Sequence, residues 1–315
     1  MVMGEKMNDI LFLKPVFKER IWGGKRLQSE FGYEIPFEKT GECWAISAHQ
    51  HGASIILDGP LKDLPLDQVF HKYRHLFNHL SSDRFPLLTK ILDANDDLSV
   101  QVHPDDTYGL SVEGELGKTE CWYVLDAIEG AEIIYGHTAK TKAQLHEMIE
   151  KDQWDDLLIR RKVKKGDFIY VPSGTIHAIG KGILILETQQ SSDTTYRVYD
   201  YHRQDESGKE RALHIKESIA VTQTPHIDPE ISMKTAMFGS STITTLVSNS
   251  FFTVEKWDIH DELTLKTNHF KLMSVIDGYG MINGHSISKG SHFIVTSMTK
   301  ELIFKGNMTL ICSYV

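Results

Sequence analysis

Cysteine is scarce in this sequence, and its scarcity argues against two kinds of site. The 315 residues include three cysteines, Cys43, Cys121 and Cys312, and none of them forms a CxxC pair. A thiolate zinc site needs such pairs, and a disulfide framework needs an even, closely spaced set. The cysteine content is therefore typical of a protein in a reducing compartment, and we expect a cytoplasmic location.

Long hydrophobic runs are also missing. Near the N-terminus, the apolar stretch extends only from Ile10 to Leu13, which is too short for the core of a signal peptide. No later run approaches the roughly 18 apolar residues of a membrane-spanning helix. We therefore expect a soluble protein with no membrane partner.

The third deficit is in basic residues. The chain has 34 Lys and Arg against 43 Asp and Glu, a formal net charge of −9, which argues against a nucleic-acid partner. A small phosphorylated ligand needs only a few local cations and stays possible. Composition is otherwise that of a globular protein, with 41% hydrophobic and 24% charged residues, and the length suffices for one large domain or two.

Short strand-like segments dominate what is present. They are rich in β-branched and aromatic residues and are bounded by Gly, Pro, Asp or Asn. Many short strands with few helices favour a sandwich or barrel over an alternating parallel sheet. The segments are Ala53–Leu57, Leu98–His103, Cys121–Ala127, Asp167–Val171, Ile183–Glu187 and Thr253–Ile259.

Two segments have helical periodicity. Apolar residues recur at helical spacing from Pro65 to Leu80. A second helical segment, within 141–160, begins at Thr141, which forms a T-x-x-Q capping box with Gln144. We also expect a domain boundary in the mixed, proline-containing stretch Gln223–Met237, which divides the chain into 1–235 and 236–315.

The first two candidate site segments are short alternating stretches. In residues 98–103, Gln101 and His103 fall on one face of a strand, about 7 Å apart. Lys118 and Glu120 alternate in the same way, and a carboxylate is a hard oxygen ligand. Taken alone, each pair is more simply explained as a solvent-facing polar stripe.

The third segment is more specific, because it combines a strand, a Pro-x-Gly turn and a histidine. In residues 166–180, Pro172 fixes the entry to the turn and Gly174 frees it from the Cβ restriction, so that His177 begins the next strand at a defined point. Downstream, Glu187 lies on the same side of its strand as Ile183 and Ile185. A lone arginine such as Arg197 is usually a surface salt-bridge partner.

Together these segments resemble the cupin motifs. Residues 166–177 match the G-x5-P-x-G-x2-H part of the second motif, although Lys181 replaces its final Asn. The set Gln101, His103 and Glu120 is similar to a variant first motif with Gln in place of the first His. Residues 290–295 begin like another second motif, but Thr296 replaces the proline. The resemblance implies a mainly β chain of two cupin-like jelly-roll barrels with a small helical insertion, the second barrel without metal.

In this order, the motifs resemble those of type I mannose-6-phosphate isomerases, in particular the short bacterial form. The matching stretches are IWGG at residue 21, GECWAIS at 41, QVHP at 101, GKTE at 117, VPSGTIHAIG at 171 and E-x4-S-D-x3-R from Glu187 to Arg197. The long insertions of the larger enzymes are missing, and the residues after Ser192-Asp193 differ from the commoner S-D-N pattern.

The resemblance implies a zinc site, a reaction and roles for residues. Zinc would be held by Gln101, His103, Glu120 and His177, and Arg197 and Lys118 would be active-site residues. The reaction would interconvert mannose 6-phosphate and fructose 6-phosphate through a cis-enediol, with zinc as Lewis acid. We expect Arg197 to stabilise negative charge, Lys118 to transfer a proton at a lowered pKa, and Glu187 to be their polar partner.

Two other functions fit the same residues. His103, Glu120 and His177 also satisfy the 2-His-1-carboxylate pattern of an iron oxygenase, although Gln101 and the two cations favour an anionic sugar. A non-catalytic cupin that binds sugar phosphates is the other alternative, because a fold does not decide function. A monomer is expected, because the second barrel can cover the first within one chain.

Overall fold

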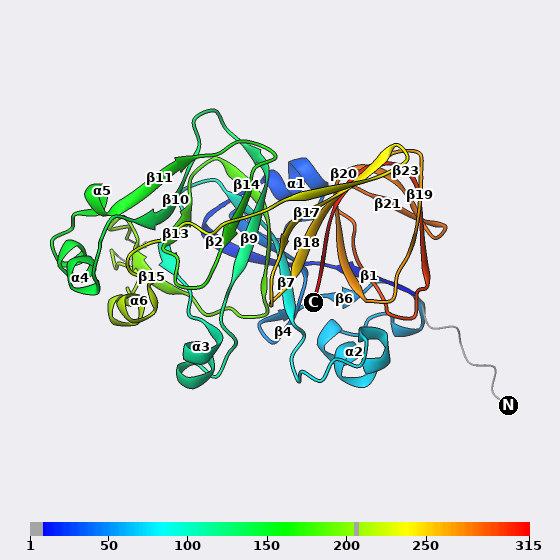
Figure 1. The fold of residues 1–315 in the computed structure, drawn as a ribbon, viewed down its shortest axis with the longest axis horizontal. Coiled ribbons are helices and arrows are strands. Elements are labelled where there is room, and N and C mark those ends of the chain that lie inside the picture. The colour runs from blue at the N-terminus through cyan, green and yellow to red at the C-terminus, as the bar shows by residue number, and fades with distance from the viewer. Residues whose placement is uncertain (1–8, 205–207) are drawn as a thin grey trace.

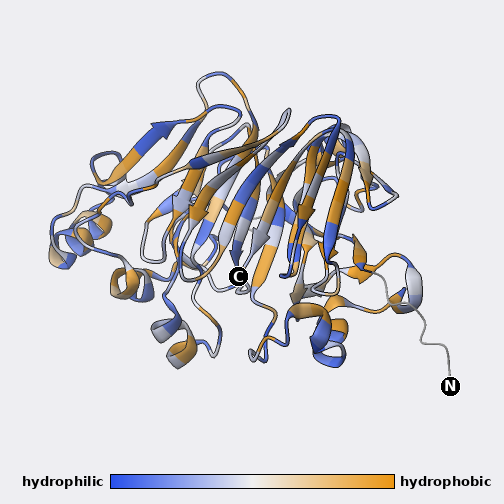
Figure 2. Ribbon diagram, turned by 45° about the vertical axis from the view of Figure 1, so that its right-hand side comes forward, coloured by the Kyte–Doolittle hydropathy of each residue, from blue (hydrophilic) through white to orange (hydrophobic). Residues whose placement is uncertain are grey.

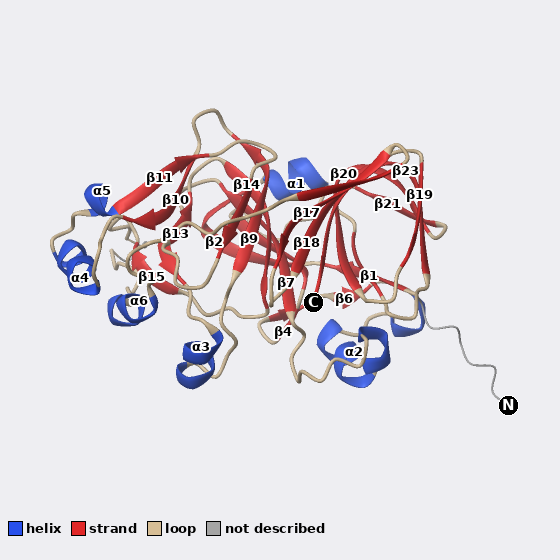
Figure 3. Cartoon of the chain, in the orientation of Figure 1, coloured by secondary structure: helices blue, strands red, loops and turns tan. Residues whose placement is uncertain are grey.

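The computed structural model describes residues 9–204 and 208–315. Residues 1–8, part of the N-terminal stretch considered above, lie outside the described residues. Strands are the predominant regular structure of the described chain, far more extensive than helices (Figure 3), so the expected mainly β class is confirmed. Within the described ranges, no helix combines the length and apolarity needed to cross a membrane.

The C-terminal part of the chain forms one large antiparallel sheet, which includes a strand from the N-terminus. β1 (Ile10–Lys14) pairs with β22 (His292–Val295) on one edge and with β6 (Ile55–Ile56) on the other. Figure 1 shows blue β1 among the orange and red strands. The remaining strands of this sheet are β16 (Lys234–Phe238), β17 (Ser241–Ser248), β18 (Thr253–Ile259), β19 (Glu262–Lys266), β20 (Lys271–Ile282), β21 (His285–Ser288) and β23 (Glu301–Tyr314).

Two further sheets, formed mainly by residues 16–199, carry the candidate site. The first has the strand order β12 (Phe168–Val171), β9 (Glu120–Ala127), β14 (Ile183–Gln190), β7 (Leu87–Ala94), β3 (Thr40–Ile46) and β2 (Val16–Gly24). The second has the order β11 (Leu158–Lys162), β10 (Glu132–His137), β13 (His177–Ile179), β8 (Val100–Val102) and β15 (Tyr196–Tyr199). A small hairpin joins β4 (Ala48–His49) to β5 (Gly52–Ala53).

Side-chain alternation divides the core of these sheets into layers. Along β14, Leu184 and Leu186 pack into one hydrophobic cluster, whereas Ile183 and Ile185 pack into another on the opposite face. Every residue of β14 is buried, as expected for a strand covered on both sides. Glu187 continues the face of Ile183 and Ile185, and it is the point at which this apolar face becomes a polar site. Figure 2 shows apolar and polar residues interspersed along the strands of the molecule.

Helices lie at the ends of the sheets (Figure 1). They are α1 (Arg26–Phe31), η1 (Gly59–Leu61), α2 (Leu66–Lys72), η2 (Arg74–Phe77), α3 (Asp106–Val112), α4 (Lys142–Glu150), α5 (Trp154–Leu157) and α6 (Ile215–Val221).

The two expected helical segments are present with changes. The single helix expected for 65–80 is divided at Tyr73 into α2 and the 3-10 turn η2, because Tyr73 leaves the helical region at φ −124°, ψ 51°. In α4, the Thr141 hydroxyl accepts from the Gln144 N–H, as expected. The side-chain amide oxygen of Gln144 accepts from the N–H of Lys140, one residue before the cap, whereas the capping box predicts the N–H of Thr141. The division at 235/236 stays a prediction.

Candidate active site

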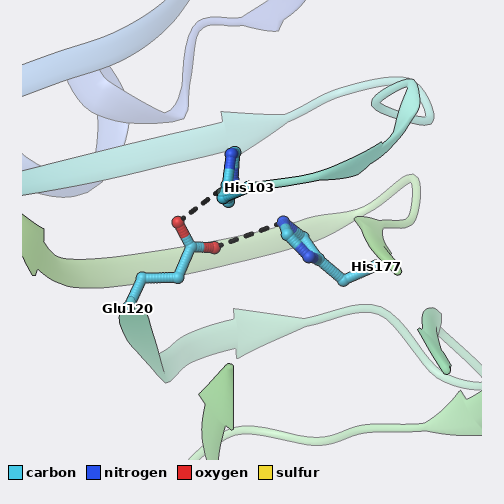
Figure 4. A group of neighbouring side chains, drawn as sticks. All are labelled: His103, Glu120 and His177. Atoms are coloured by element: carbon cyan, nitrogen blue, oxygen red, sulfur yellow. Dashed lines mark ion pairs between the residues drawn. The ribbon is translucent and has the colours of Figure 1, made fainter. Parts of the chain in front are cut away.

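Three side chains that are far apart in the sequence converge at the ends of neighbouring strands. His103 follows β8, Glu120 begins β9, and His177 begins β13. Each offers a ligand atom within 4.8 Å of the others, and all three side chains are buried. Figure 4 shows the carboxylate of Glu120 reaching toward both imidazoles. Each of its oxygens lies 3.4 Å from a histidine Nε2.

Backbone carbonyl groups orient both imidazoles. Nδ1 of His103 lies 3.0 Å from the carbonyl oxygen of Thr194, and Nδ1 of His177 lies 2.8 Å from that of Thr175. Because a carbonyl only accepts, each Nδ1 carries the proton and each Nε2 presents its lone pair toward Glu120. Burial lowers the pKa of His177 to about 4, and burial and Lys118 lower the pKa of His103 well below its usual value. Both rings are thus neutral, as metal ligation requires.

Gln101 lies beside this group. It pairs with His177 across the β8–β13 ladder, and its amide nitrogen is 3.3 Å from Nε2 of His177. A 180° turn of the amide exchanges its nitrogen and oxygen and places an oxygen ligand at that position. The structure thus brings together all four expected ligands. A set of two imidazoles, one carboxylate and one amide suits zinc and other first-row divalent metals.

Two glycines explain why the chain takes this path. Gly174 has φ +85°, a region that favours glycine, and its N–H donates to the carbonyl oxygen of His103 over 2.9 Å. The turn after β12 is therefore tied to the end of β8. Gly117 packs against the start of α3, where a Cβ atom would lie 2.5 Å from the backbone nitrogen of Asp106. Because the backbone at Gly117 lies so close to α3, the following residues Lys118 and Glu120 lie next to His103.

Lys118 is buried at the centre of the group. Its Nζ lies 2.7 Å from Oε2 of Glu120, 3.1 Å from Nε2 of His103 and 3.9 Å from Oε1 of Glu187. Burial favours the neutral amine, but the carboxylates of Glu120 and Glu187 outweigh it, and the pKa of Lys118 is raised. The expectation of a lowered pKa is therefore wrong for these contacts, because it considered a neighbouring cation and not the two carboxylates.

A cavity of about 280 Å³ opens beside the group and reaches the remaining expected residues. Gln101, Lys118, Glu187 and Arg197 line it, with five basic and three acidic side chains in its wall. The chain carries an overall charge of −9, so the wall of this cavity is more basic than the chain as a whole, which favours an anionic ligand.

Two buried polar atoms in this wall have no hydrogen-bond partner within the described part of the chain. They are Nε of Arg197 and Oε1 of Glu187. Nη1 of Arg197 donates to the carbonyl oxygen of Ala212 over 2.8 Å, which holds the guanidinium in place. Burial and the charge of Glu120 raise the pKa of Glu187. A free donor and a free acceptor in one cavity are what a polar ligand would satisfy.

The sequence did not reveal some of the lining cations. Lys90 is buried in β7, with Nζ 3.8 Å from Oε1 of Glu187 and 4.9 Å from the ring centroid of Trp44. A lysine inside the otherwise mostly apolar run Leu87–Ala94 is unusual enough to have been noticed. Arg20 and Arg211 also line the cavity, but no local pattern distinguishes them from surface arginines.

Comparison with known proteins decides the family. Residues 10–126 match the model for the phosphomannose isomerase type I catalytic domain, and residues 242–315 match that for the mannose-6-phosphate isomerase cupin domain. A mannose-6-phosphate isomerase from Streptococcus mutans is 53% identical over 313 residues, covering 98% of this chain and 99% of that protein. The chain belongs to the mannose-6-phosphate isomerase family.

Solved structures agree with this placement. The crystal structure of the mannose 6-phosphate isomerase from Bacillus subtilis has a TM-score of 0.95 and 49% identity, and the match covers 98% of this chain and 100% of that one. A putative mannosephosphate isomerase from Archaeoglobus fulgidus, at 20% identity and a TM-score of 0.76, shows the same fold. The expected family, enzyme class and cupin fold are confirmed.

Proposed function

We propose that the cavity beside His103, Glu120 and His177 interconverts mannose 6-phosphate and fructose 6-phosphate through a cis-enediol. The observation that carries this proposal is a buried, metal-competent group beside a cavity with excess positive charge. This combination suits a phosphorylated sugar whose reaction develops negative charge on oxygen. The relatives from Streptococcus mutans and Bacillus subtilis bear the name of this activity.

We assign the metal site to Gln101, His103, Glu120 and His177, with zinc as the metal. When bound, zinc would act as a Lewis acid for a sugar oxygen. The two imidazoles support this assignment, because their Nε2 atoms are neutral and face the carboxylate. Gln101 is the least basic of the four donors and would be the most easily displaced.

The cavity residues divide into anion binders and proton-transfer groups. Arg197, with its unpartnered Nε–H, would bind the enediolate or phosphate oxygen. Lys118 carries a proton in the contacts described above, so it would act as a proton donor to a sugar oxygen. Glu187 has a raised pKa and an oxygen without a hydrogen-bond partner, which suits a group that exchanges protons with a ligand. The positive charge of Lys90, whose Nζ lies 3.8 Å from Oε1 of Glu187, limits the rise in the pKa of Glu187.

The test is a turnover assay with control of the metal. Purified protein is mixed with mannose 6-phosphate, and formation of fructose 6-phosphate is followed with a chelator, without it, and after zinc is added back. We expect activity to be lost with the chelator and restored by zinc. Full zinc occupancy without turnover would contradict the isomerase proposal. Oxygen uptake would then favour the iron oxygenase, and binding of mannose 6-phosphate without turnover would favour the non-catalytic module.

We also propose a cytoplasmic monomer with a domain boundary near residue 235. The three free, buried cysteines suit a reducing compartment. Light scattering that gives the mass of two chains would contradict the monomer, and recovery outside the cytoplasmic fraction would contradict the location. Limited proteolysis tests the boundary, because a site between Thr222 and Ser241 should be cut first if the prediction is right.

A further inference from the structure

A polar cluster beside the cavity joins three segments of the chain, and one of its residues, Asp193, lies in the cavity wall. His49 and His51 come from the β4–β5 hairpin, Glu115 comes from the loop between α3 and β9, and residues 192–194 come from the loop between β14 and β15. The hairpin histidines have no ligand spacing in the sequence. The structure shows that they pair with carboxylates.

Glu115 is the centre of this cluster. Its Oε2 accepts hydrogen bonds from the Ser192 hydroxyl (3.3 Å), the backbone N–H of Asp193 (3.2 Å) and the Thr194 hydroxyl (3.1 Å). One carboxylate oxygen thus binds three successive residues of the loop. Burial opposes ionisation, but the hydrogen bonds from the backbone of Asp193 and the hydroxyls of Ser192 and Thr194, together with the nearby His49, outweigh it, and the pKa of Glu115 is lowered. Glu115 is therefore a charged acceptor, and hydrogen bonds to charged groups are the stronger kind.

The histidine hairpin holds the other oxygen of Glu115. Nε2 of the buried His49 lies 3.3 Å from Oε1 of Glu115. Nδ1 of His49 accepts the backbone N–H of His51 over 3.2 Å, so the ring proton is on Nε2 and points to the carboxylate. His51 in turn lies 3.1 Å from Oδ2 of Asp193. His49 thus fixes the carboxylate of Glu115. The loop at 192–194 is held both by Glu115 and by His51.

The loop bound by Glu115 also holds a proposed metal ligand. The carbonyl oxygen of Thr194 is the group that accepts from Nδ1 of His103. A carbonyl partner of this kind sets the tautomer and the ring orientation of a ligating histidine. Glu115 itself does not line the cavity and can act on the site only through this loop.

We infer that Glu115 is a positioning residue: it holds residues 192–194 so that Thr194 orients His103 for metal binding. This inference rests on the proposed metal site. Removing Glu115 would leave three loop donors without their acceptor and let the Thr194 carbonyl move away from His103. Partners of a ligating histidine typically contribute roughly 10- to 100-fold in metal affinity, so we expect about a tenfold loss for this more indirect contact.

The experiment compares Glu115→Ala with Glu147→Ala as the matched control. Glu147 lies on α4, where its side chain forms an exposed ion pair with Lys151. Zinc affinity is measured by chelator competition in the absence of substrate, so it does not depend on turnover. We expect about a tenfold weaker affinity for Glu115→Ala and no change for the control. An affinity within twofold of the wild type in a folded Glu115→Ala protein would overturn the inference.

Two further variants separate positioning from general stability. Thr194→Val removes one of the three bonds to Glu115 but keeps the carbonyl that binds His103. We expect a smaller loss of affinity for Thr194→Val, and no additional loss when it is combined with Glu115→Ala, because both act through one contact. Additive losses would contradict the proposed route. If Glu115→Ala does not fold, Glu115→Gln replaces it, because an amide oxygen keeps an acceptor but lacks the charge.

Nuclear magnetic resonance of the histidine rings provides a readout that needs no metal. In the metal-free wild type, the Nδ1–H of His103 should be protected from solvent exchange by the Thr194 carbonyl. Glu115→Ala should accelerate this exchange, and Glu147→Ala should not. Unchanged exchange in Glu115→Ala would overturn the inference even if the wild type bound no zinc. Zinc binding without isomerisation would contradict only the proposed function.

Discussion

Two buried histidines, one in each half of the molecule, show what distinguishes a candidate ligand from a structural residue. His177 begins β13 in the sheets of the candidate site, and His292 begins β22 in the large C-terminal sheet; both are almost fully buried. His177 uses Nδ1 for a backbone carbonyl and turns Nε2 toward Glu120. His292 uses both nitrogens, with Ser274 Oγ 2.8 Å from Nδ1 and Tyr33 Oη 2.7 Å from Nε2.

The surroundings of His177 and His292 also differ. The core around His177 ends in charged residues and a cavity, whereas the interior of the C-terminal half is filled by large apolar side chains such as Trp257, Phe293 and Phe304. Burial alone therefore does not indicate a metal ligand. The useful criterion is a neutral ring whose Nδ1–H is bound by a backbone carbonyl and whose Nε2 faces other ligand atoms.

The largest expected effect is the loss of activity when His177, but not His292, is replaced. His177→Ala should lower isomerase activity by more than about 100-fold, because even an outer partner of a ligand is worth roughly 10- to 100-fold in activity or affinity. His292→Ala should leave kcat/KM within about threefold and instead destabilise the fold by about 1–3 kcal/mol, since Tyr33 and Ser274 lose a buried partner. Activity and thermal unfolding of both variants are the measurement. Equal loss of activity would break the comparison.

A pair of lysines extends the comparison to charge. Lys118→Met should reduce turnover roughly 100- to 10,000-fold, which is the usual range for a proton-transfer group. Lys271, in the C-terminal half, lies 3.5 Å from the ring centroid of Tyr314. Lys271→Met should cost only about 0.5–1 kcal/mol of stability, the size of a cation–π contact, and leave turnover intact. Steady-state kinetics on the zinc-loaded proteins tests both variants. Unchanged turnover in Lys118→Met would show that Lys118 is only a structural ion-pair partner.

The last expected effect is a dependence of stability on pH. Burial lowers the pKa of His292 to about 3 from the usual 6.5. Between these values, the unfolded chain binds a proton that the folded protein does not, so stability falls as the pH drops below about 6.5. One such proton contributes at most about 1.4 kcal/mol per pH unit.

The matched variants are His292→Gln, which cannot titrate, and His269→Gln, which replaces an exposed histidine. Denaturant unfolding of the zinc-loaded proteins between pH 4 and 7 is the measurement. The slope of stability against pH should be shallower in His292→Gln than in the wild type, and unchanged in His269→Gln. Identical slopes in all three proteins would show that His292 is not the group responsible.

Much of the site could be read from local patterns. Gln101 and His103 alternate on a strand, the Pro172–Gly174 turn precedes His177, and Lys118 and Glu120 share a face, all of which depend only on backbone geometry. Lys90 and Glu115 were not found, because their roles depend on segments that are distant in the sequence. The expected pKa of Lys118 failed for the same reason, since Glu187 comes from another strand.

The amino-acid sequence by itself determined the mainly β class, the short strands, the turn before His177 and the residue types available as ligands. These follow from side-chain periodicity and from the backbone freedom of Pro and Gly. Only the tertiary structure decided which histidine turns a ring nitrogen toward other ligand atoms, which lysine faces two carboxylates, and which strand from the N-terminus completes the C-terminal sheet. Such properties depend on distances between chain segments, because electrostatic interaction and desolvation act through space and not along the chain.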